Sequence, residues 1–315
     1  MERSVRVNVK ATEAMIVYLK NHEIDRELWD ACIKASPTSK PYAFSWYLDI
    51  MAPDWEALID DDYDSVFPVP ARERYGIKYI ATPIFLQQLG TFSPDKSAES
   101  ATAEFLDYMP EFYWLIDLAV GHRTDYPGFK IIERSNFELV LDKPYEKLYD
   151  SFTSDCRRNI NLASRKKINL TSEIGADELI SLFISTTGSK VSGVKTRDYE
   201  RLTKLIKYCV GAGKGKITGV RDSYGKLIYG LFYIETSDSV TLLFTVNSEI
   251  SRERRIGYYA VNEIIREKAG SGITLDFAGS SIPSIASFME SFGSTNSPYY
   301  KIFRNKLPWP IRMLK

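Results

Sequence analysis

The order in which strand-like and helical segments follow one another constrains the fold of this chain most, because the same order occurs twice. In the first half, an apolar segment at residues 15–19 predicts a strand, and helical patterns follow at 26–35 and 43–51. Two apolar runs around the acidic turn at 60–64 then predict a hairpin. The remaining segments of this half have strand-like or helical composition and lie at 75–81, 86–91, 98–108, 112–119 and 129–141.

The second half repeats the order strand, two helices, hairpin, strand, helix, strand. A basic helical region at 143–167 precedes it. The predicted elements are a strand at 168–173, helices at 177–186 and 198–210, strands at 215–221, 226–235 and 239–246, a helix at 256–269, a strand at 272–277, a helix at 282–291 and a strand at 299–304. Two related α/β units, residues 1–143 and 144–315, therefore account for the length of 315 residues better than a single domain does.

Charge is divided between these two units. Lys+Arg and Asp+Glu each total 41, so the whole chain is formally neutral. Residues 1–143 contain 15 basic and 24 acidic side chains, whereas residues 144–315 contain 26 and 17. An acidic half is therefore joined to a basic half, and any anionic ligand is expected on the basic one.

Several classes of function are disfavoured by residue types and their spacing. The three cysteines lie far apart and the two histidines show no metal-binding spacing, so we expect neither a disulfide framework nor a bound metal. The phosphate-binding pattern GxxxxGK[ST] is missing, and the glycines of 211–215 follow a helix and precede a strand, which is typical of a helix stop. No apolar run approaches the length of a membrane span, and we expect a cytoplasmic protein.

A cluster of arginines precedes the predicted helix at 256–269. A right-handed crossover would place the strand at 272–277 beside the strand at 239–246, with Arg252, Arg254, Arg255 and Gly257 in the segment that links them. A helix N-terminus carries unpaired N–H groups and partial positive charge, so with these arginines it suits a pyrophosphate. An exposed basic loop is the alternative interpretation.

At this point the sequence resembles a known family. Arg254-x-x-Gly257-x-Tyr259 is similar to the Q/R-x-x-G-x-G/A pyrophosphate loop of the GNAT acyltransferase superfamily, and this resemblance covers about residues 168–305. The tandem arrangement resembles the Fem-type peptidyltransferases and their bacterial relatives. The motifs that carry the Fem-type resemblance are the basic helix at 154–167, the strand end Asp276-Phe277-Ala278-Gly279, and Phe288 with Phe292-Gly293 in the helix that follows.

The resemblance implies an α/β fold of two tandem GNAT-like domains, each a mixed, mostly antiparallel sheet flanked by helices. Residues 1–143 would be a degenerate domain, and residues 144–315 the domain that binds substrates. The implied activity is transfer of an activated acyl group, from acyl-CoA or aminoacyl-tRNA, to an amine on a small molecule or peptide. No tightly bound cofactor is implied, and tRNA is a partner only with the second donor.

One residue departs from the superfamily loop. Tyr259 stands where that loop has glycine or alanine, and Tyr258 precedes it. Such bulk favours a donor other than CoA, or a loop that binds no donor. The donor-binding residues expected from the resemblance are Arg252, Arg254, Arg255, Gly257 and Tyr258.

Catalysis of this kind depends on positioning and on stabilising an oxyanion, for which a backbone N–H of the strand at 239–246 is the natural donor. Asp276 is the candidate base, with capping of the next helix or pairing with an arginine as its structural alternative. Tyr299 and Tyr300 are candidate acids, and their alternative is packing within a strand.

Polar residues of two other segments are candidates for substrate binding. Arg157, Asn161 and Arg165 recur at helical spacing on one face, with Arg158 beside them, and could hold a phosphate or simply form a solvated face. Gln87 and Gln88 could donate to a substrate carbonyl or complete a strand edge.

Two functions from different classes follow. The first is an acyl- or aminoacyl-transferase with its site on the basic half. The second is a catalytically inactive GNAT-like protein that binds a ligand or partner. General nucleic-acid binding is disfavoured by overall neutrality.

Overall fold

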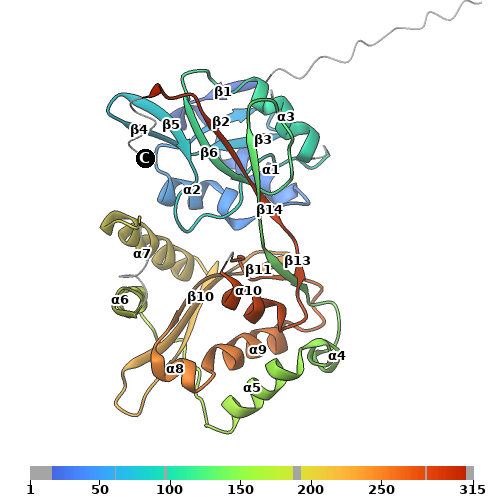
Figure 1. The fold of residues 1–315 in the computed structure, drawn as a ribbon, viewed down its shortest axis with the longest axis vertical. Coiled ribbons are helices and arrows are strands. Elements are labelled where there is room, and N and C mark those ends of the chain that lie inside the picture. Colours follow the sequence, from blue (N-terminus) through green and yellow to red (C-terminus); the bar gives the residue numbers. More distant parts are fainter. Residues whose placement is uncertain (1–15, 61, 96–97, 187–192, 281, 310–315) are drawn as a thin grey trace, which may run out of the picture.

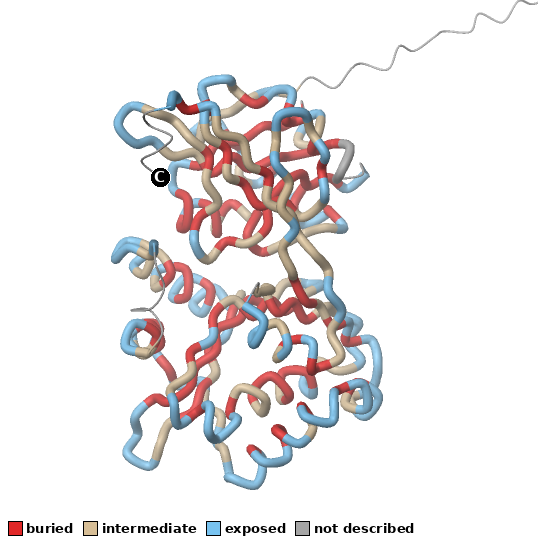
Figure 2. Tube along the Cα trace, in the orientation of Figure 1, coloured by how far each residue is buried: buried red, intermediate tan, exposed pale blue. Residues whose placement is uncertain are grey.

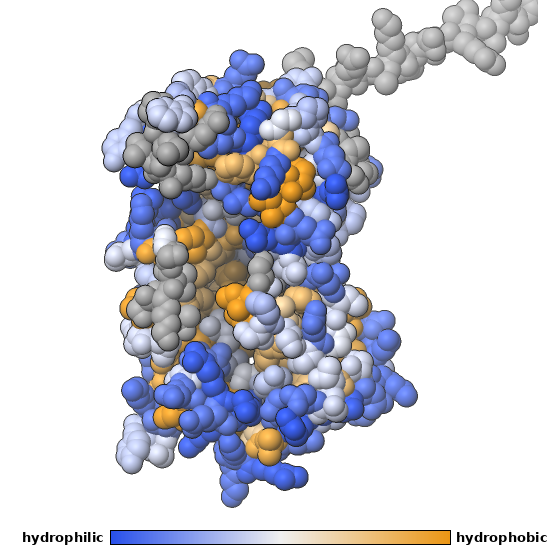
Figure 3. All heavy atoms as spheres, viewed as in Figure 1, coloured by the Kyte–Doolittle hydropathy of each residue, from blue (hydrophilic) through white to orange (hydrophobic). Residues whose placement is uncertain are grey.

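The chain forms two lobes that are joined by two extended stretches lying side by side (Figure 1). The computed structural model describes residues 16–60, 62–95, 98–186, 193–280 and 282–309. Buried residues run along the strands and the inner faces of the helices in both lobes (Figure 2). The surface is hollowed where the lobes meet, and apolar residues lie deep in that hollow (Figure 3).

The upper lobe is built from the first half of the chain and one late strand. A small antiparallel sheet contains β1 (Val17–Leu19), β2 (Glu56–Ile59) and β3 (Val66–Val69), and every residue of the last two strands is buried. This confirms the predicted hairpin. The larger sheet has the spatial order β4 (Ala71–Arg74), β5 (Ile77–Ala81), β6 (Leu115–Val120), β14 (Tyr299–Asn305) and β7 (Lys130–Arg134).

Helices of the upper lobe begin where the sequence offers a cap or a favourable first turn. Asp25 accepts hydrogen bonds from the N–H groups of Glu27 and Leu28 at 2.9 and 3.1 Å, and this starts the first long helix. The helices are η1 (Asn21–Glu23), α1 (Arg26–Ala35), η2 (Pro41–Ala43), α2 (Ser45–Met51) and α3 (Ala98–Asp107).

The last strand of the chain differs in position from the sequence expectation. The segment at 299–304 was predicted to close the series of the second half, but β14 lies between β6 and β7 of the upper lobe and is antiparallel to both. Its buried Ile302 stands opposite Leu118 on one side and Ile131 on the other. Apolar alternation identifies such a strand without identifying its sheet, because any half-buried sheet accepts the same pattern.

The lower lobe contains one six-stranded sheet. Its strands in spatial order are β13 (Thr295–Asn296), β8 (Phe137–Val140), β12 (Thr274–Asp276), β11 (Ser239–Asn247), β10 (Leu227–Glu235) and β9 (Gly215–Arg221). The last three form the predicted antiparallel meander, and β12 lies parallel to β11, as the crossover argument requires. The predicted strand at 168–173 is reduced to a single bridge between Thr171 and Gly219.

Helices cover both faces of this sheet. One face is covered by α6 (Ala176–Thr186) and α7 (Thr196–Gly211), and the other by α4 (Tyr145–Ser151), α5 (Ser154–Ser164), α8 (Glu249–Glu253), α9 (Ile256–Lys268) and α10 (Pro283–Glu290). The basic region at 143–167 is two helices, because the chain turns at Phe152 and Thr153 caps α5 by accepting the Cys156 N–H at 3.1 Å.

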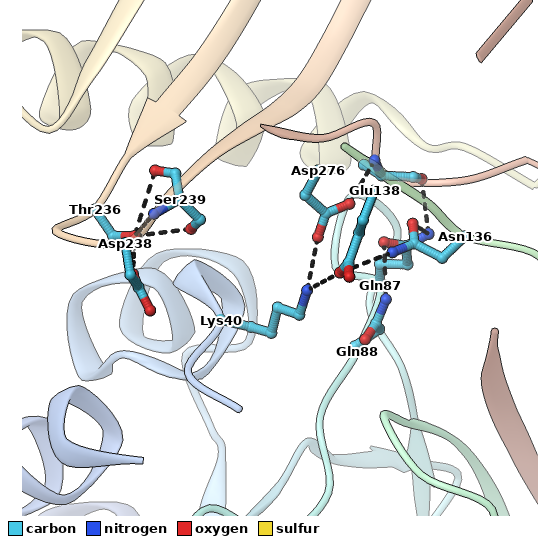
Figure 4. Close-up of polar contacts among 10 residues, drawn as sticks. Lys40, Gln87, Gln88, Asn136, Glu138, Thr236, Asp238, Ser239 and Asp276 are labelled. Carbon is cyan, nitrogen blue, oxygen red and sulfur yellow. Dashed lines mark hydrogen bonds and ion pairs between the residues drawn. The ribbon is translucent and has the colours of Figure 1, made fainter. Parts of the chain in front are cut away.

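Charged side chains connect the lobes at one buried point (Figure 4). Lys40 of the upper lobe lies 2.8 Å from Asp276 of β12 and 2.6 Å from Glu138 of β8, measured from Nζ to the carboxylate oxygens. The Asp276 side chain is only 1% exposed. Burial of the ammonium favours its neutral form, but the two carboxylates outweigh that effect and raise the pKa of Lys40.

We predict that Lys40→Met lowers the free energy of unfolding by about 3–5 kcal/mol, because it leaves the buried Asp276 carboxylate without its cation. The raised pKa keeps this contribution present at neutral pH and removes it only as pH rises above the ordinary lysine value of 10.5. Urea unfolding of both proteins between pH 6 and 9 measures the difference, which should stay constant over that range.

The matched control is Lys207→Met, which removes an exposed lysine that lies 2.7 Å from Asp177. This change should alter stability by less than about 0.5 kcal/mol. Equal losses in the two variants would contradict a special role for the buried contact.

Candidate functional site

The two parallel strands of the lower lobe separate after three paired residues. Ser239, Val240 and Thr241 of β11 pair with the three residues of β12, which ends at Asp276, whereas β11 continues to Asn247. Beyond Asp276 the chain turns away, because Ala278 and Gly279 adopt positive φ angles of 55° and 47°. The Asp276 Oδ1 accepts the Ala278 N–H at 2.8 Å and so holds this turn.

The free edge of β11 carries backbone groups that β10 does not use. The Ser248 N–H donates to the Ile228 carbonyl of β10 at 3.1 Å. Because backbone groups alternate along an antiparallel strand, those of Thr245 and Asn247 point away from β10, into the gap beside β12. Closer to β12, the pairing shifts so that Leu242 and Leu243 stand opposite Tyr233, which is a β-bulge.

A pocket of about 620 Å³ occupies this gap. Its walls come from β10, β11, α8, α9 and α10 and from the turn after β12. The residues that line it are Tyr229, Leu242, Leu243, Thr245, Asn247, Ser251, Arg252, Arg255, Gly257, Tyr258, Val261, Phe277, Ala278, Gly279, Ser280, Ser284, Ile285, Phe288 and Met289. One end is therefore apolar, and the other combines hydroxyl, amide and guanidinium groups.

The N-terminus of α9 forms part of the polar end. Arg255 precedes the helix in the left-handed region, with φ of 60°, and provides no side-chain cap. Within the described chain, the N–H groups of Ile256 and Gly257 have no backbone acceptor. A Cβ atom added to Gly257 would lie 3.8 Å from Asn247 Oδ1 and from Tyr229 Cε2. The glycine thus leaves room at the start of the helix for a ligand to approach the free N–H groups.

The arginines of this segment are not equivalent. Arg252 and Arg255 line the pocket, whereas Arg254 is not among the lining residues. In the described part of the chain, none of the three takes part in an ion pair, so their charge is available to a ligand. The short helix α8, which carries Arg252, was expected as a linking segment without helical structure; Ser248 caps it by accepting the Ser251 N–H at 3.2 Å.

The two tyrosines of the loop also differ. Tyr258 lines the pocket, and its ring packs against Phe288 and Phe292 with centroid distances of 4.8 and 5.9 Å. Burial raises its pKa, so its hydroxyl is protonated at neutral pH. Tyr259, whose bulk raised the question of a blocked loop, is not among the lining residues.

The basic face of α5 has two different kinds of residue. Arg157 Nη1 donates to the carbonyls of Phe152 and Asp150 at 2.6 and 2.9 Å and thereby caps the C-terminus of α4. Arg158 pairs with Asp155 at 2.6 Å in the solvent, and Asn161 and Arg165 are exposed. The end of this helix reaches α8, since Lys166 Nζ donates to the Glu253 carbonyl at 3.2 Å.

The candidate catalytic residues lie outside the 620 Å³ pocket. Asp276 lines a separate pocket of about 230 Å³ on the side of the upper lobe, together with Lys40, Glu138 and Gln88. Tyr299 lines another pocket, of about 390 Å³, whose wall also contains Gln87.

Tyr300 and the glutamines have structural contacts of their own. Tyr300 stands between Val120 and Glu133 in the upper sheet. Gln87 Nε2 donates to the Ala278 carbonyl at 2.7 Å and so links the upper lobe to the turn after β12 (Figure 4). The buried Gln88 lies 3.5 Å from Gln87. The structure therefore brings together the expected donor-binding residues but not the expected catalytic ones.

Three pocket residues were not anticipated from the sequence. Asn247 and Ser251 flank the basic segment, and their polar character at a strand end was a usable signal. Tyr229 lies within a continuous apolar run, Leu227 to Ile234, where nothing distinguishes it from a core residue. Its position depends on strand register, which places it opposite Asn247.

We predict that Arg157→Met lowers the free energy of unfolding by about 1–3 kcal/mol, because the carbonyls at the end of α4 lose a charged donor. Arg158→Met, which alters an exposed pair on the same helix, should change stability by less than about 0.5 kcal/mol. Thermal unfolding of the two variants checks this, and a larger loss for Arg158→Met would contradict it.

Comparisons with known proteins place this geometry in a wider context. A scan against protein-family models finds no match, and a search of curated proteins finds no related sequence. Solved structures are similar at low identity. The structure of FemX is 15% identical with a TM-score of 0.65, and the match covers 92% of this chain and 98% of FemX.

Two further structures agree. A conserved protein of unknown function from Bacteroides thetaiotaomicron is 11% identical with a TM-score of 0.59, covering 89% and 97% of the two chains. L-PGS from Bacillus licheniformis is 11% identical with a TM-score of 0.53, covering 92% and 95%. No described helix combines the length and apolar composition needed to cross a bilayer. The chain has a GNAT-like, Fem-like α/β fold, with mostly antiparallel sheets flanked by helices.

Proposed function

We propose that this protein is an acyl- or aminoacyl-transferase that moves an activated acyl group onto an amine. The observation that carries the proposal is the pocket between β11 and the turn after β12. It joins an open strand edge to the N-terminus of a 13-residue helix, and two arginines without ion pairs in the described chain lie beside it. This is a combination suited to an elongated donor with an anionic group at one end.

The polar end of the pocket supports binding of a phosphate-bearing donor. The free N–H groups at the start of α9 and the helix dipole favour negative charge, and Arg252 and Arg255 add two full positive charges. CoA and the 3′ end of tRNA both carry phosphates, so this end serves either proposed donor.

The strand edge supports the chemistry of transfer. Backbone groups of Thr245 and Asn247 face the gap and can align a donor along β11. When an amine attacks the acyl carbon, negative charge develops on the carbonyl oxygen, and a fixed N–H donor at this edge stabilises it. Holding donor and amine together lowers the barrier further, because a bimolecular step becomes effectively unimolecular.

Proton transfer is less well provided for. The Asp276 carboxylate is engaged by Lys40 and by the Ala278 N–H, and it lies on the opposite side of the turn from the pocket. A role for Tyr299 as acid requires the leaving group to reach the 390 Å³ pocket. We therefore assign most of the catalysis to positioning and oxyanion stabilisation. The same observation favours the second candidate, a protein that binds a donor-like ligand without transferring its acyl group.

The names of the similar structures are compatible with group transfer. A fourth solved structure, from Agrobacterium fabrum, is 8% identical with a TM-score of 0.51 and is described as the C-terminal domain of a putative lysylphosphatidylglycerol synthetase. That name implies attachment of an amino acid to a lipid head group. It supports the broad class of reaction and leaves the donor and acceptor of this chain as proposals.

We predict that one of the two donors stabilises the protein against heat. Thermal unfolding is followed while acetyl-CoA or charged tRNA is titrated, and a ligand at 100 times its Kd adds about 2.7 kcal/mol. Release of free CoA or deacylated tRNA on adding an amine distinguishes transfer from binding alone. The proposal fails if neither donor shifts the unfolding temperature.

We further predict that Gly257→Ala weakens donor binding at least tenfold without lowering the stability of the free protein. The added methyl group meets its neighbours at ordinary contact distances of 3.8–3.9 Å, and alanine favours the helix. The methyl group nevertheless occupies the space a ligand needs to reach the N–H groups of α9. Gly211→Ala, at the end of α7 in open space, is the matched control and should bind normally. Equal binding by both variants would contradict this placement of the donor.

A further inference from the structure

A buried hydroxyl without a partner lies at the polar end of the pocket. Tyr229 of β10 is fully buried, and within the described chain its Oη has no hydrogen-bond partner. Leaving a buried hydroxyl unsatisfied costs about 1–3 kcal/mol, so such groups are rare unless they have a function. Because Tyr229 also lines the 620 Å³ pocket, a ligand there can supply the missing partner.

The surroundings of Tyr229 define the chemistry of that partner. Strand register places Asn247 opposite Tyr229, and both residues lie about 3.8 Å from the position of a Cβ on Gly257. Burial raises the pKa of Tyr229, so its hydroxyl is protonated and able to donate at neutral pH. The Asn247 amide offers two further N–H donors.

Charge in the pocket has one sign only. Among the described residues that line it, Arg252 and Arg255 are cationic and none is Asp, Glu or His. An ammonium group that entered the pocket would find no carboxylate and would lie near two guanidinium groups. Burying an unpaired charge is costly, so the pocket discriminates against such a ligand.

We infer that Tyr229 and Asn247 form an oxygen-binding subsite that selects an acyl donor with an oxygen acceptor at this position and no ammonium group. This inference rests on the proposed function and names its donor class: neutral or anionic acyl thioesters, or aminoacyl esters whose amine is blocked. Tyr229 acts here as a specificity residue, because its hydrogen bond is realised only with the correct ligand.

The first test is Tyr229→Phe, which removes the hydroxyl and keeps the ring. The free protein should be as stable as the wild type or more stable, since an unsatisfied buried group is removed. Affinity for the donor that binds the wild type should fall about tenfold, the equivalent of one hydrogen bond. Wild-type affinity, or a loss of stability in the free protein, would overturn the inference by showing that the hydroxyl serves the fold.

Tyr42→Phe is the matched control. Tyr42 is also fully buried with an unpartnered hydroxyl in the described chain, but it does not line this pocket. This variant should keep wild-type donor affinity. A comparable fall in affinity in both variants would show that the effect is general and would overturn the assignment to Tyr229.

The second test compares donors that differ in charge. Acetyl-CoA, succinyl-CoA and β-alanyl-CoA carry neutral, anionic and cationic acyl groups, and phenylalanyl-tRNA is compared with N-acetylphenylalanyl-tRNA. We expect the ammonium-bearing member of each set to bind at least tenfold more weakly in thermal titrations. Equal or tighter binding of the ammonium-bearing donors would overturn the inference and leave the proposed function standing. Failure of all five to bind would overturn both.

Discussion

The buried carboxylate of Asp276 is the interaction on which the rest of this structure depends. One of its oxygens accepts from the Lys40 ammonium of the upper lobe, and the other accepts the Ala278 N–H. The first contact joins the two lobes at a point where water has little access. The second ends β12 and starts the left-handed turn at Ala278 and Gly279. A charge buried to this degree needs both partners, so lobe contact, strand end and pocket wall are linked through one side chain.

The two parallel strand pairs of the molecule show why only one of them leaves a pocket of this kind. In the upper lobe, β5 and β6 also separate after Ala81 and Asp117, but the following loop covers the exposed edge of β6. Thr82 Oγ1 accepts the Ala119 N–H at 2.8 Å, and Leu89 resumes parallel pairing with Val120. The same loop sends Gln87 to the Ala278 carbonyl of the lower lobe. The upper lobe thus fills its own gap and supports the wall of the other.

Much of the fold could be predicted from the sequence, because hydrophobic periodicity is a local property. The hairpin of β2 and β3, the meander of β9 to β11 and the parallel placement of β12 were all confirmed. Of the candidate site, Arg252, Arg255, Gly257 and Tyr258 lie together around the pocket, since they are close in sequence at one helix start. Residues contributed by other elements were not predictable in the same way. Tyr229 resembles a core residue in its strand, and Arg157 resembles a ligand-binding residue until its contacts with the end of α4 are known.

The sequence by itself determined the element types, their order and the accumulation of positive charge in the second half, because propensity, patterning and charge are encoded within short stretches of chain. Only the tertiary structure decided which sheet received the last strand, where β11 lost its partner, and which side chains surround the resulting pocket. Lys40 and Asp276 are 236 residues apart, and Gln87 and Ala278 are 191 apart. Contacts at such separations depend on packing and on the burial of charge, and no local pattern carries that information.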